Sequence, residues 1–544
     1  ASDAIDKLYF RSLTDDSVKL KKKDFFIRLA ADKENRTLTV RDNGIGMTKE
    51  ELEKNLGTIA KSGSLDFKNE NETGGKVDVI GQFGVGFYSA FMVASRVTVR
   101  SRAFGAQEAW QWESTGAEGY TIEPCDKEDV GTEVILVVKE NEGEEHYDEF
   151  LDDWRLAGIV KKYSDYIRYP IKMLREKSRA IEGTDKDEEG HYKAPEYETY
   201  TEDETLNSMV PIWKRDKKKV KDEEYAQFYK DKFGDYSDPA RVIQSKTEGT
   251  ATFNALLFIP SRTPYNYYTK EYEKGLQLYS SGVMIMDKCP DLVPNHFRFV
   301  RGVVDSADFS LNISREMLQH TRQLKVVANN LEKKIKAELL RIQKEDREKY
   351  ETFWKAFGLS VKLGVIADYG AHKDLLRDLL LFWSSKEKKP VTLAEYVSRM
   401  PEDQKFIYYA SGETPDKIAK LPQVERIAEK GYEILCLTDE PDEFVMQVLH
   451  EIDGKELKSV TAEDALPETD EEMAPDSVQD FKAEQVLELN PDSGAFSALR
   501  AAVDSDRDLA KKYAELLYHQ ALLIAGLPLE DPVAYSELVC SLMK

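Results

Sequence analysis

Two glycine-rich segments carry the residues best suited to chemistry in this chain. The first is Asp42-Asn43-Gly44-Ile45-Gly46-Met47. An ionised aspartate only accepts hydrogen bonds, so Asp42 suits an exocyclic amine such as that of adenine. Gly44 and Gly46 let the backbone approach a flat ring, and Met47 offers that ring a polarisable apolar surface. Taken alone, such a segment is more often a simple turn, so it does not identify a ligand.

The second segment is Gly81-Gln82-Phe83-Gly84-Val85-Gly86-Phe87, and it leads into an apolar run from Phe87 to Ala94 that suits a helix. Glycines before a helix leave backbone N–H groups free to bind phosphate oxygens. No Gly-Lys-[Ser/Thr] follows, so this is not a Walker loop, and the surrounding pattern is not that of a Rossmann unit. The two segments together predict a pocket with an adenine end and a phosphate end.

The hydrophobic pattern of residues 1–145 predicts the elements that must position these segments. Three short apolar runs are predicted strands: 25–29, 37–40 and 134–138. Thr48 followed by Glu51 has the spacing of a capping box, which predicts the start of a helix. The apolar residues that follow lie on one helical face: Leu52, Leu56 and Ile59. These signals predict one α+β domain that carries both glycine segments.

The rest of the chain predicts further domains joined by acidic linkers. Residues 184–204 and 463–476 are rich in acids and poor in bases, a composition typical of linkers or exposed loops. Strands are predicted at 256–259, 283–286 and 432–437, and helices at 324–347 and 375–380. Two apolar helices end the chain, around 513–524 and from Asp531 onward. We expect these two to dimerise, and the alternative is that they pack only on their own domain.

Composition and charge exclude several classes of function. The chain has 544 residues, enough for several domains, and a formal net charge of −24. Such a surface repels nucleic acid and anionic membranes, so neither is a predicted partner. No apolar run reaches the roughly 18 residues of a transmembrane helix. The cysteines and histidines show no metal-binding spacing, so no metal site is predicted from them, and the few dispersed cysteines suggest a reducing, intracellular environment.

Longer stretches of the chain carry a family resemblance. Residues 55–63 (Asn-Leu-Gly-Thr-Ile-Ala-Lys-Ser-Gly) and 81–91 (Gly-Gln-Phe-Gly-Val-Gly-Phe-Tyr-Ser-Ala-Phe) resemble the heat-shock protein 90 chaperones, as do 302–306 and 311–316. An adenine motif, a glycine-bounded stretch and a phosphate loop, in that order, resemble the superfamily of gyrase, chaperone, histidine-kinase and mismatch-repair ATPases. The ending Ser541-Leu542-Met543-Lys544 lacks the Glu-Glu-Val-Asp tail and the Lys-Asp-Glu-Leu signal, and resembles the bacterial type.

The resemblance implies a fold and a function. The fold would be α+β and multidomain, with an N-terminal α/β sandwich of the ATPase superfamily type at 1–145, truncated at its start. Residues 146–204 would hold the end of that domain, a linker and the entry to an α/β middle domain at 205–450. A mostly helical dimerisation domain would occupy 451–544. The implied function is that of an ATP-dependent chaperone, which binds and remodels clients through nucleotide-driven closure of a homodimer and hydrolyses ATP slowly.

The resemblance also implies roles for single residues in the nucleotide pocket. Asp42 would bind the adenine amine. The base and ribose would be lined by Gly46, Met47, Asn55 and Thr132, with Asp3 and Ala4 on the opposite wall. The phosphates of ATP or ADP, with Mg²⁺, would be held by Lys61 and by the backbone of Gly81, Gly84, Val85, Gly86 and Phe87. Residues 57–87 would form a lid that closes over the nucleotide.

Catalysis would depend on a second domain. Arg315 would reach from the middle domain to the γ-phosphate, with Gln319 one turn further along the same helix. An arginine delivered by another domain makes hydrolysis depend on domain docking. The family's Mg²⁺-binding Asn and its water-activating Glu would both fall before Ala1. Residues 463–485 suggest a join between distant segments, with residues absent there.

Two alternatives to the ATP-dependent chaperone stay open. One is an ATP-independent holdase or scaffold of the same fold that lacks the catalytic Glu. The other is a DNA mismatch-repair or topoisomerase-like ATPase, which would need a basic groove that a charge of −24 argues against. The expected partners are unfolded or partly folded client proteins, a second copy of the chain and possible co-chaperones. The expected location is the bacterial cytoplasm, and the expected physiological role is in the stress response.

Overall fold

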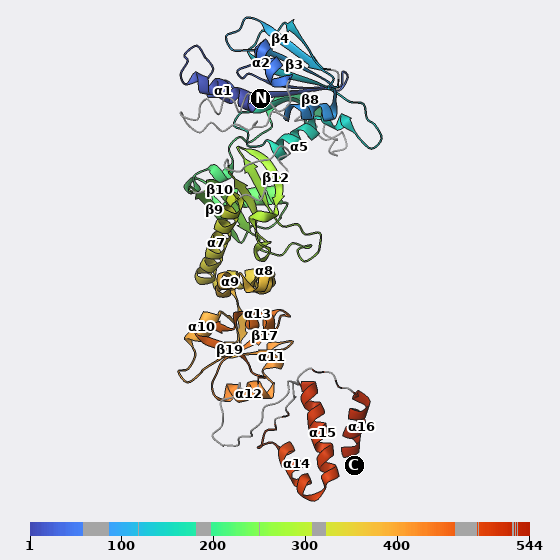
Figure 1. The fold of residues 1–544 in the computed structure, drawn as a ribbon, viewed down its shortest axis with the longest axis vertical. Helices are drawn as coiled ribbons and strands as arrows, with labels where there is room; N and C mark the ends of the chain where they lie inside the picture. The colour runs from blue at the N-terminus through green and yellow to red at the C-terminus, as the bar shows by residue number, and fades with distance from the viewer. Residues whose placement is uncertain are drawn as a thin grey trace, which may run out of the picture. The chain divides into compact units, whose positions relative to one another are not determined.

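The computed structural model describes residues 1–57, 86–117, 119–180, 197–249, 251–306, 322–462, 487, 489–524, 527, 529 and 531–543 (Figure 1). They form two compact units, Ala1–Ser360 and Val361–Lys544, and each is described by itself. Among these residues, no helix is both long enough and apolar enough to cross a lipid bilayer.

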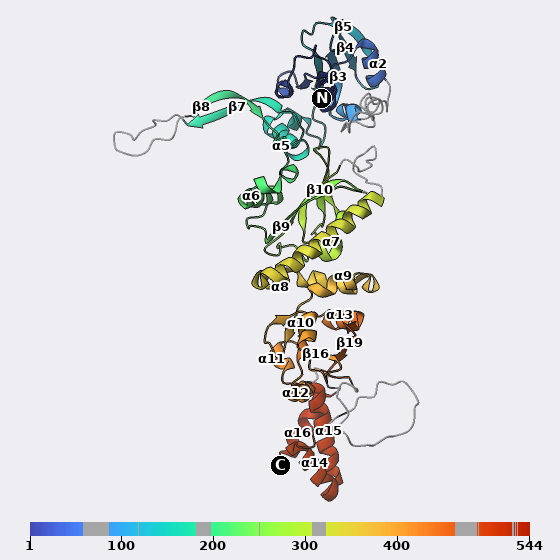
Figure 2. The same ribbon diagram turned by 90° about the vertical axis from the view of Figure 1, so that its left-hand side faces the viewer.

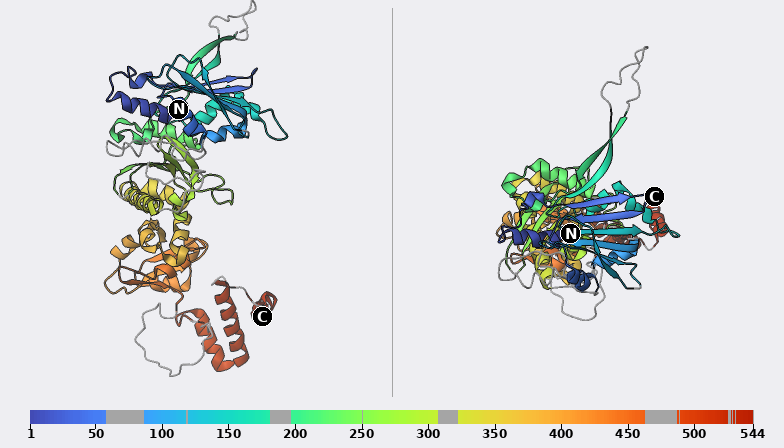
Figure 3. Two further views of the ribbon diagram at one scale, coloured as in Figure 1. Left: turned by 45° about the horizontal axis from the view of Figure 1, so that its top comes forward. Right: turned by 90° about the horizontal axis from the view of Figure 1, so that it is seen from above.

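The first unit contains an eight-stranded sheet in the order β5-β4-β3-β6-β2-β1-β7-β8 (Figures 1 and 3). Its strands are β1 (Ile27–Asp32), β2 (Thr37–Asp42), β3 (Ala94–Arg102), β4 (Ala109–Ser114), β5 (Thr121–Cys125), β6 (Gly131–Val138), β7 (Ile171–Ala180) and β8 (Tyr197–Thr205). All neighbouring pairs are antiparallel except β1 and β7. The strands predicted at 37–40 and 134–138 are confirmed as parts of β2 and β6.

Short helices pack their apolar faces on this sheet. They are α1 (Ser2–Ser12), α2 (Lys49–Leu56), the 3-10 turn η2 (Gly86–Ser89), α4 (Ala90–Val93) and α5 (Asp153–Tyr163). The capping box that starts α2 is confirmed, because Thr48 Oγ1 accepts from the Glu51 N–H and the Glu51 carboxylate accepts from the Thr48 N–H. Leu52 and Leu56 of α2 are buried in one cluster with Trp112 and residues of β3. The helix, which follows the first glycine segment in the chain, is thereby packed on the sheet.

The linker predicted at 184–204 is wrong for its last part, because residues 197–204 belong to strand β8. With β7, this strand leaves the rest of the sheet as a two-stranded ribbon (Figure 2). The acids that indicated a linker are neutralised by bases across the ribbon: Arg175 pairs with Glu204 at 2.7 Å, Lys177 with Glu202 at 2.9 Å, and Arg179 with Glu198. Opposite charges facing each other across two strands stabilise the pair, and a composition count cannot detect that pairing.

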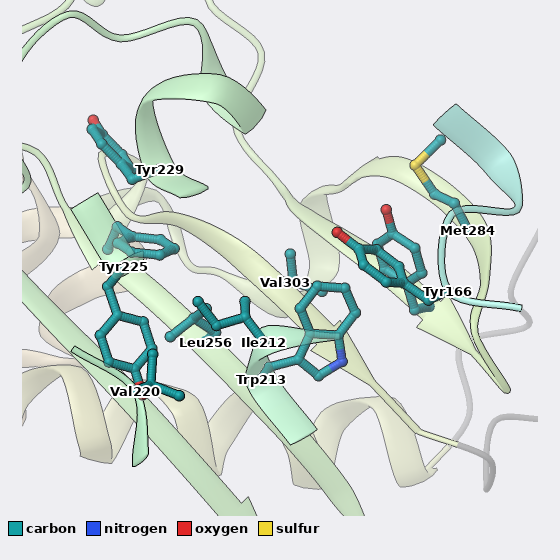
Figure 4. Packing of buried hydrophobic residues seen from close by; sticks show 11 residues of the cluster. Tyr166, Ile212, Trp213, Val220, Tyr225, Tyr229, Leu256, Met284 and Val303 are labelled. Atoms are coloured by element: carbon teal, nitrogen blue, oxygen red, sulfur yellow. The ribbon is translucent and has the colours of Figure 1, made fainter. Parts of the chain in front are cut away.

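A second, five-stranded sheet of the first unit has the order β12-β11-β13-β10-β9. Its strands are β9 (Arg241–Thr247), β10 (Phe253–Ile259), β11 (Leu276–Ser280), β12 (Val283–Cys289) and β13 (Arg301–Asp305), and its helices are α6 (Asp222–Phe233), α7 (Arg322–Glu345) and the first part of α8 (Arg347–Ile366), whose last residues, from Val361, belong to the second unit. In its core the ring of Tyr166 lies 4.5 Å from that of Trp213 (Figure 4). The helix predicted at 324–347 stops at Glu345, because the Asp346 carboxylate accepts from the Lys349 N–H and caps a new helix, α8.

The second unit contains a six-stranded sheet in the order β15-β14-β17-β16-β19-β18. Its strands are β14 (Phe382–Ser384), β15 (Pro390–Val391), β16 (Ile407–Ser411), β17 (Ile434–Leu437), β18 (Glu451–Ile452) and β19 (Lys455–Ser459). Its helices are α9 (Lys373–Leu376), α10 (Leu393–Ser398), α11 (Pro415–Ile418), α12 (Pro422–Glu429), α13 (Asp442–Leu449), α14 (Gly494–Ser505), α15 (Arg507–Ile524) and α16 (Pro532–Leu542). The two terminal helices predicted from the sequence are confirmed as α15 and α16, and the acidic stretch 463–476 lies outside the described residues.

The helix predicted at 375–380 is only partly correct. Helix α9 ends at Leu376, a 3-10 turn covers Arg377–Leu379, and Leu380 is already extended. The buried run Leu379–Phe382 is the approach to β14. A short apolar run fits a buried helix and a buried strand equally well, so periodicity alone could not separate them.

Candidate nucleotide site

The centre of the site is a buried carboxylate at the end of β2. Asp42 is 5% exposed, and its Oδ1 accepts a hydrogen bond from the Gly44 N–H at 2.9 Å. Burial raises the pKa of Asp42, and the nearby backbone N–H groups of Gly44 and Thr132 and the positive charge of Lys127 oppose that rise. The carboxylate therefore keeps acceptor capacity that the backbone does not use up.

The loop after Asp42 is held where only glycine fits. A Cβ on Gly44 would lie 2.5 Å from the carbonyl carbon of Ala4, and Gly46 has φ +69° with the Arg102 oxygen 2.0 Å from its Cβ position. On one side, the Ile45 N–H donates to the Ala4 oxygen at 3.0 Å. On the other, the Ile45 oxygen accepts from the Phe104 N–H at 2.8 Å. The loop is thereby fixed between helix α1 and the end of β3.

Two further residues, Ser101 and Gly131, lie beside the loop after Asp42, and neither was predicted from the sequence. Ser101 on β3 is fully buried, accepts from the Met47 N–H at 2.9 Å, and lies 2.9 Å from Thr132 Oγ1. A Cβ on Gly131 would lie 2.2 Å from the backbone carbonyl oxygen of Asp42, so β6 begins in close contact with β2. One signal for Ser101 was present, because strand alternation places it on the buried side with Val97 and Val99.

The structure brings one group of the predicted site residues together. Asp42, Gly46, Met47, Thr132 and Ala4 surround the loop through the contacts given above. Two other residues are placed by their helices only. Asp3 lies on α1, which starts at Ser2, and Asn55 lies on α2, whose Leu52 and Leu56 pack in the cluster that also contacts Met47 and Phe87. The roles of Asp3 and Asn55 toward a ligand stay predictions.

The phosphate end is described in part. Gly86 begins η2, and no described atom lies within 4 Å of the position that a Cβ would take there. The Phe87 ring lies 5.5 Å from that of Trp112, and Tyr88 donates from its hydroxyl to the Leu56 oxygen at 2.8 Å. These contacts tie η2 to α2 and the sheet. The other predicted phosphate-binding and catalytic residues lie outside the described residues: Lys61, Gly81, Gly84, Val85, Arg315 and Gln319.

Comparison with known proteins gives this geometry a family. Residues 13–135 match the histidine kinase-, DNA gyrase B- and HSP90-like ATPase family, and residues 179–480 and 474–544 match the Hsp90 protein family. Over the full length of the chain and 94% of the relative, the sequence is 52% identical to the chaperone protein HtpG of Clostridium acetobutylicum. The chain belongs to the Hsp90 family. The HtpG proteins of Bacillus subtilis and Clostridium botulinum are each 50% identical over the same shares.

Membership of the Hsp90 family states the general function. The protein is an ATP-dependent molecular chaperone with ATPase activity, which binds nucleotide and client proteins and dimerises. The predicted α+β multidomain fold is confirmed, with an N-terminal domain of the Hsp90-like ATPase type and mixed sheets and helices throughout. The comparisons favour neither the ATP-independent holdase nor the DNA-repair or topoisomerase alternative.

Proposed function

We propose that the loop Gly44–Met47 and the ends of β2, β3 and β6 form the adenine pocket of this Hsp90-family ATPase. The observation that carries the proposal is the buried Asp42 carboxylate, which has backbone donors and retains acceptor capacity. An exocyclic amine supplies the missing donor, and a buried charged acceptor makes that hydrogen bond strong. The closely packed backbone at Gly44 and Gly46 gives the base a rigid wall.

The proposal extends from the base to the ribose and phosphates. Met47, Asn55 and Thr132 would contact the base and ribose, with Asp3 and Ala4 on the opposite wall. The backbone N–H groups of 81–87 and the ammonium group of Lys61 would hold the phosphates. Supporting this part, no described atom lies within 4 Å of the Cβ position at Gly86. Mg²⁺ prefers oxygen ligands and usually accompanies a triphosphate, so it belongs to the proposal.

Hydrolysis would be completed by Arg315, which stabilises charge on the γ-phosphate when the middle domain docks, with Gln319 beside it. Such an arginine contributes only in the closed state, so turnover would be slow and gated by closure of the lid at 57–87. Client binding would then follow the cycle of closing and reopening.

The domain organisation of the proposal follows the sequence boundaries. The nucleotide domain at 1–145 would end within 146–204, followed by a middle domain at 205–450 and a dimerisation domain at 451–544 that forms a homodimer. Two observations support a join near 463–485. The family match splits into residues 179–480 and 474–544. The alignments with two relatives span 599 and 600 positions, whereas this chain has 544 residues. We place the protein in the bacterial cytoplasm and leave co-chaperones as possible partners.

The proposal is tested by ADP binding and ATP hydrolysis of the full chain. Asp42→Asn is expected to weaken ADP binding about ten- to a hundredfold, because a charged acceptor is lost. Asp165→Asn is its control, since Asp165 is equally buried but binds Lys161 and the Ser208 N–H instead. Unchanged ADP affinity in Asp42→Asn would overturn the adenine pocket.

The catalytic half needs its own variant. Arg315→Ala is expected to bind ADP normally and to lose at least about a hundredfold in turnover, because the γ-phosphate charge loses its partner. Arg341→Ala, which removes an exposed arginine paired along its own helix with Glu345, is the control and should keep full turnover. Full turnover by Arg315→Ala, or ADP binding by the unmodified chain with no hydrolysis, would overturn the catalytic half alone.

A further inference from the structure

One buried serine connects three parts of the pocket. Ser101 Oγ accepts from the Met47 N–H at 2.9 Å, lies 2.9 Å from Thr132 Oγ1, and donates to the Gly131 oxygen at 3.3 Å. Its side chain is fully buried on β3. The serine therefore links the loop Gly44–Met47 to the start of β6.

The hydroxyl protons are assigned from their neighbours. A serine hydroxyl donates one proton and accepts with two lone pairs. The Gly131 oxygen can only accept, so it takes the Ser101 proton, and the Met47 N–H occupies one lone pair. The second lone pair then accepts the proton of Thr132. This assignment satisfies all three contacts at once, as buried polar groups require.

The assignment determines what Thr132 offers to a ligand. With its proton given to Ser101, Thr132 Oγ1 presents lone pairs alone. Asp42 is the direct cross-strand partner of Thr132 and, when ionised, also presents acceptors alone. Two neighbouring acceptors favour a ligand group with two N–H donors, such as the amine of adenine. They disfavour the carbonyl oxygen that guanine and hypoxanthine carry at the same position.

We propose that Ser101 is a positioning residue that sets the base specificity of the site. By accepting the Thr132 proton, Ser101 makes Thr132 an acceptor and so selects an amino purine over an oxo purine. This inference rests on the proposed adenine pocket around Asp42. Ser101 acts through Thr132 and through the Met47 backbone, and not by contact with the base.

Calorimetric titration of the full chain with ADP and IDP tests the inference, since IDP carries a carbonyl where ADP carries the amine. The unmodified chain is expected to bind ADP at least about tenfold more tightly than IDP. Ser101→Ala frees the Thr132 proton, so ADP should weaken about tenfold while IDP changes much less. Thr132→Val should lower the ADP/IDP ratio similarly. The double variant should lower it no further, because the two residues act as one unit.

Ser114→Ala separates this role from a general loss of packing. Ser114 is a buried serine on β4 whose hydroxyl also donates to a carbonyl, that of Gly119, and accepts from an N–H, that of Gly116. It should lower the melting temperature without changing the ADP/IDP ratio. An unchanged ratio in folded Ser101→Ala, or additive changes in the double variant, would overturn the inference. If Ser101→Ala does not fold, an unchanged ADP/IDP ratio in Thr132→Val would overturn the inference. Binding of neither nucleotide by the unmodified chain would instead overturn the proposed function.

Discussion

Each unit of the molecule buries an aspartate, and the two are stabilised in different ways. Burial raises the pKa of both Asp42 in the first unit and Asp442 in the second. Asp442 is 1% exposed, and the Lys362 ammonium lies 2.6 Å from its Oδ1. In the described part of the chain, Asp42 forms no ion pair with any side chain, and its Oδ1 accepts a hydrogen bond from the Gly44 N–H.

The two centres also differ in what surrounds them. Lys362 is 3% exposed and also pairs with Asp439 at 2.7 Å, while Asp442 Oδ2 accepts from the Thr438 and Asp439 N–H groups. The buried Asp442 charge is paired with a buried side-chain cation in that centre, which suits a structural role. Around Asp42, close-packed glycines and a small buried hydroxyl stand where side-chain cations would otherwise be expected. A buried carboxylate with no side-chain ion pair among the described residues is a candidate ligand site, because a ligand can supply a further donor.

The largest expected effect comes from breaking the balanced centre. Lys362→Met leaves Asp442 buried without its cation, which should lower the free energy of unfolding of the second unit by about 3–5 kcal/mol. Scanning calorimetry of the full chain would show this as a lower temperature for the transition that ADP does not shift. Lys355→Met, an exposed position on the same helix, is the control. An unchanged transition temperature in Lys362→Met would mean that the Lys362–Asp442 ion pair is not structural.

The same substitution at the two aspartates sharpens the contrast. Asp442→Asn removes the partner of a buried ammonium and should destabilise the second unit by about 2 kcal/mol. Asp42→Asn removes a buried charge that forms no side-chain ion pair among the described residues, so it should leave the stability of the first unit within about 0.5 kcal/mol or raise it, although it weakens ADP binding. Both are read from one calorimetric scan without nucleotide. Equal destabilisation by the two variants would erase the distinction between a structural and a functional aspartate.

A third variant tests the close packing of the backbone in the loop after Asp42. Gly46→Ala places a side chain at φ +69° against the Arg102 oxygen, which should cost more than about 2 kcal/mol and weaken ADP binding. Gly158→Ala in helix α5, where a Cβ meets nothing within 4 Å, should stabilise by about 0.5–1 kcal/mol. Thermal denaturation and an ADP titration measure both. Normal ADP affinity in Gly46→Ala would show that the loop tolerates displacement.

The smallest expected effect is a pair of opposite pH dependences. A carboxyl whose folded pKa lies above its ordinary value of 3.8 binds more protons in the folded than in the unfolded state between those values. Stability should therefore fall as pH rises through that window. ADP binding needs ionised Asp42, so affinity should instead weaken as pH falls through the raised pKa. Asp42→Asn should remove this titration from the residual affinity. Affinity that weakens only near pH 3.8 would contradict a raised pKa in the site.

Signals between residues that are close in sequence predicted much of the fold and part of the candidate nucleotide site. The capping box at Thr48, the strand at 37–40 and the helix start at Asp531 depend on neighbours in sequence, and all three are confirmed. Strand β8 was missed because its acids are neutralised by β7, and that pairing appears only when the strands meet. Asp42 could be chosen from its glycines. Ser101 could not be chosen in the same way, because a serine in a strand acquires a role only when β3, β6 and the loop converge on it.

The most direct test of the central claim is a crystal structure of the full chain with ADP. The account predicts that the exocyclic amine lies within hydrogen-bond distance of an Asp42 carboxylate oxygen, and that the base stacks along the Gly44–Met47 backbone. It also predicts that the Met47–Ser101–Thr132 contacts are unchanged from those described here. Nucleotide bound elsewhere, or Asp42 contacting the ribose or a phosphate in place of the amine, would contradict it.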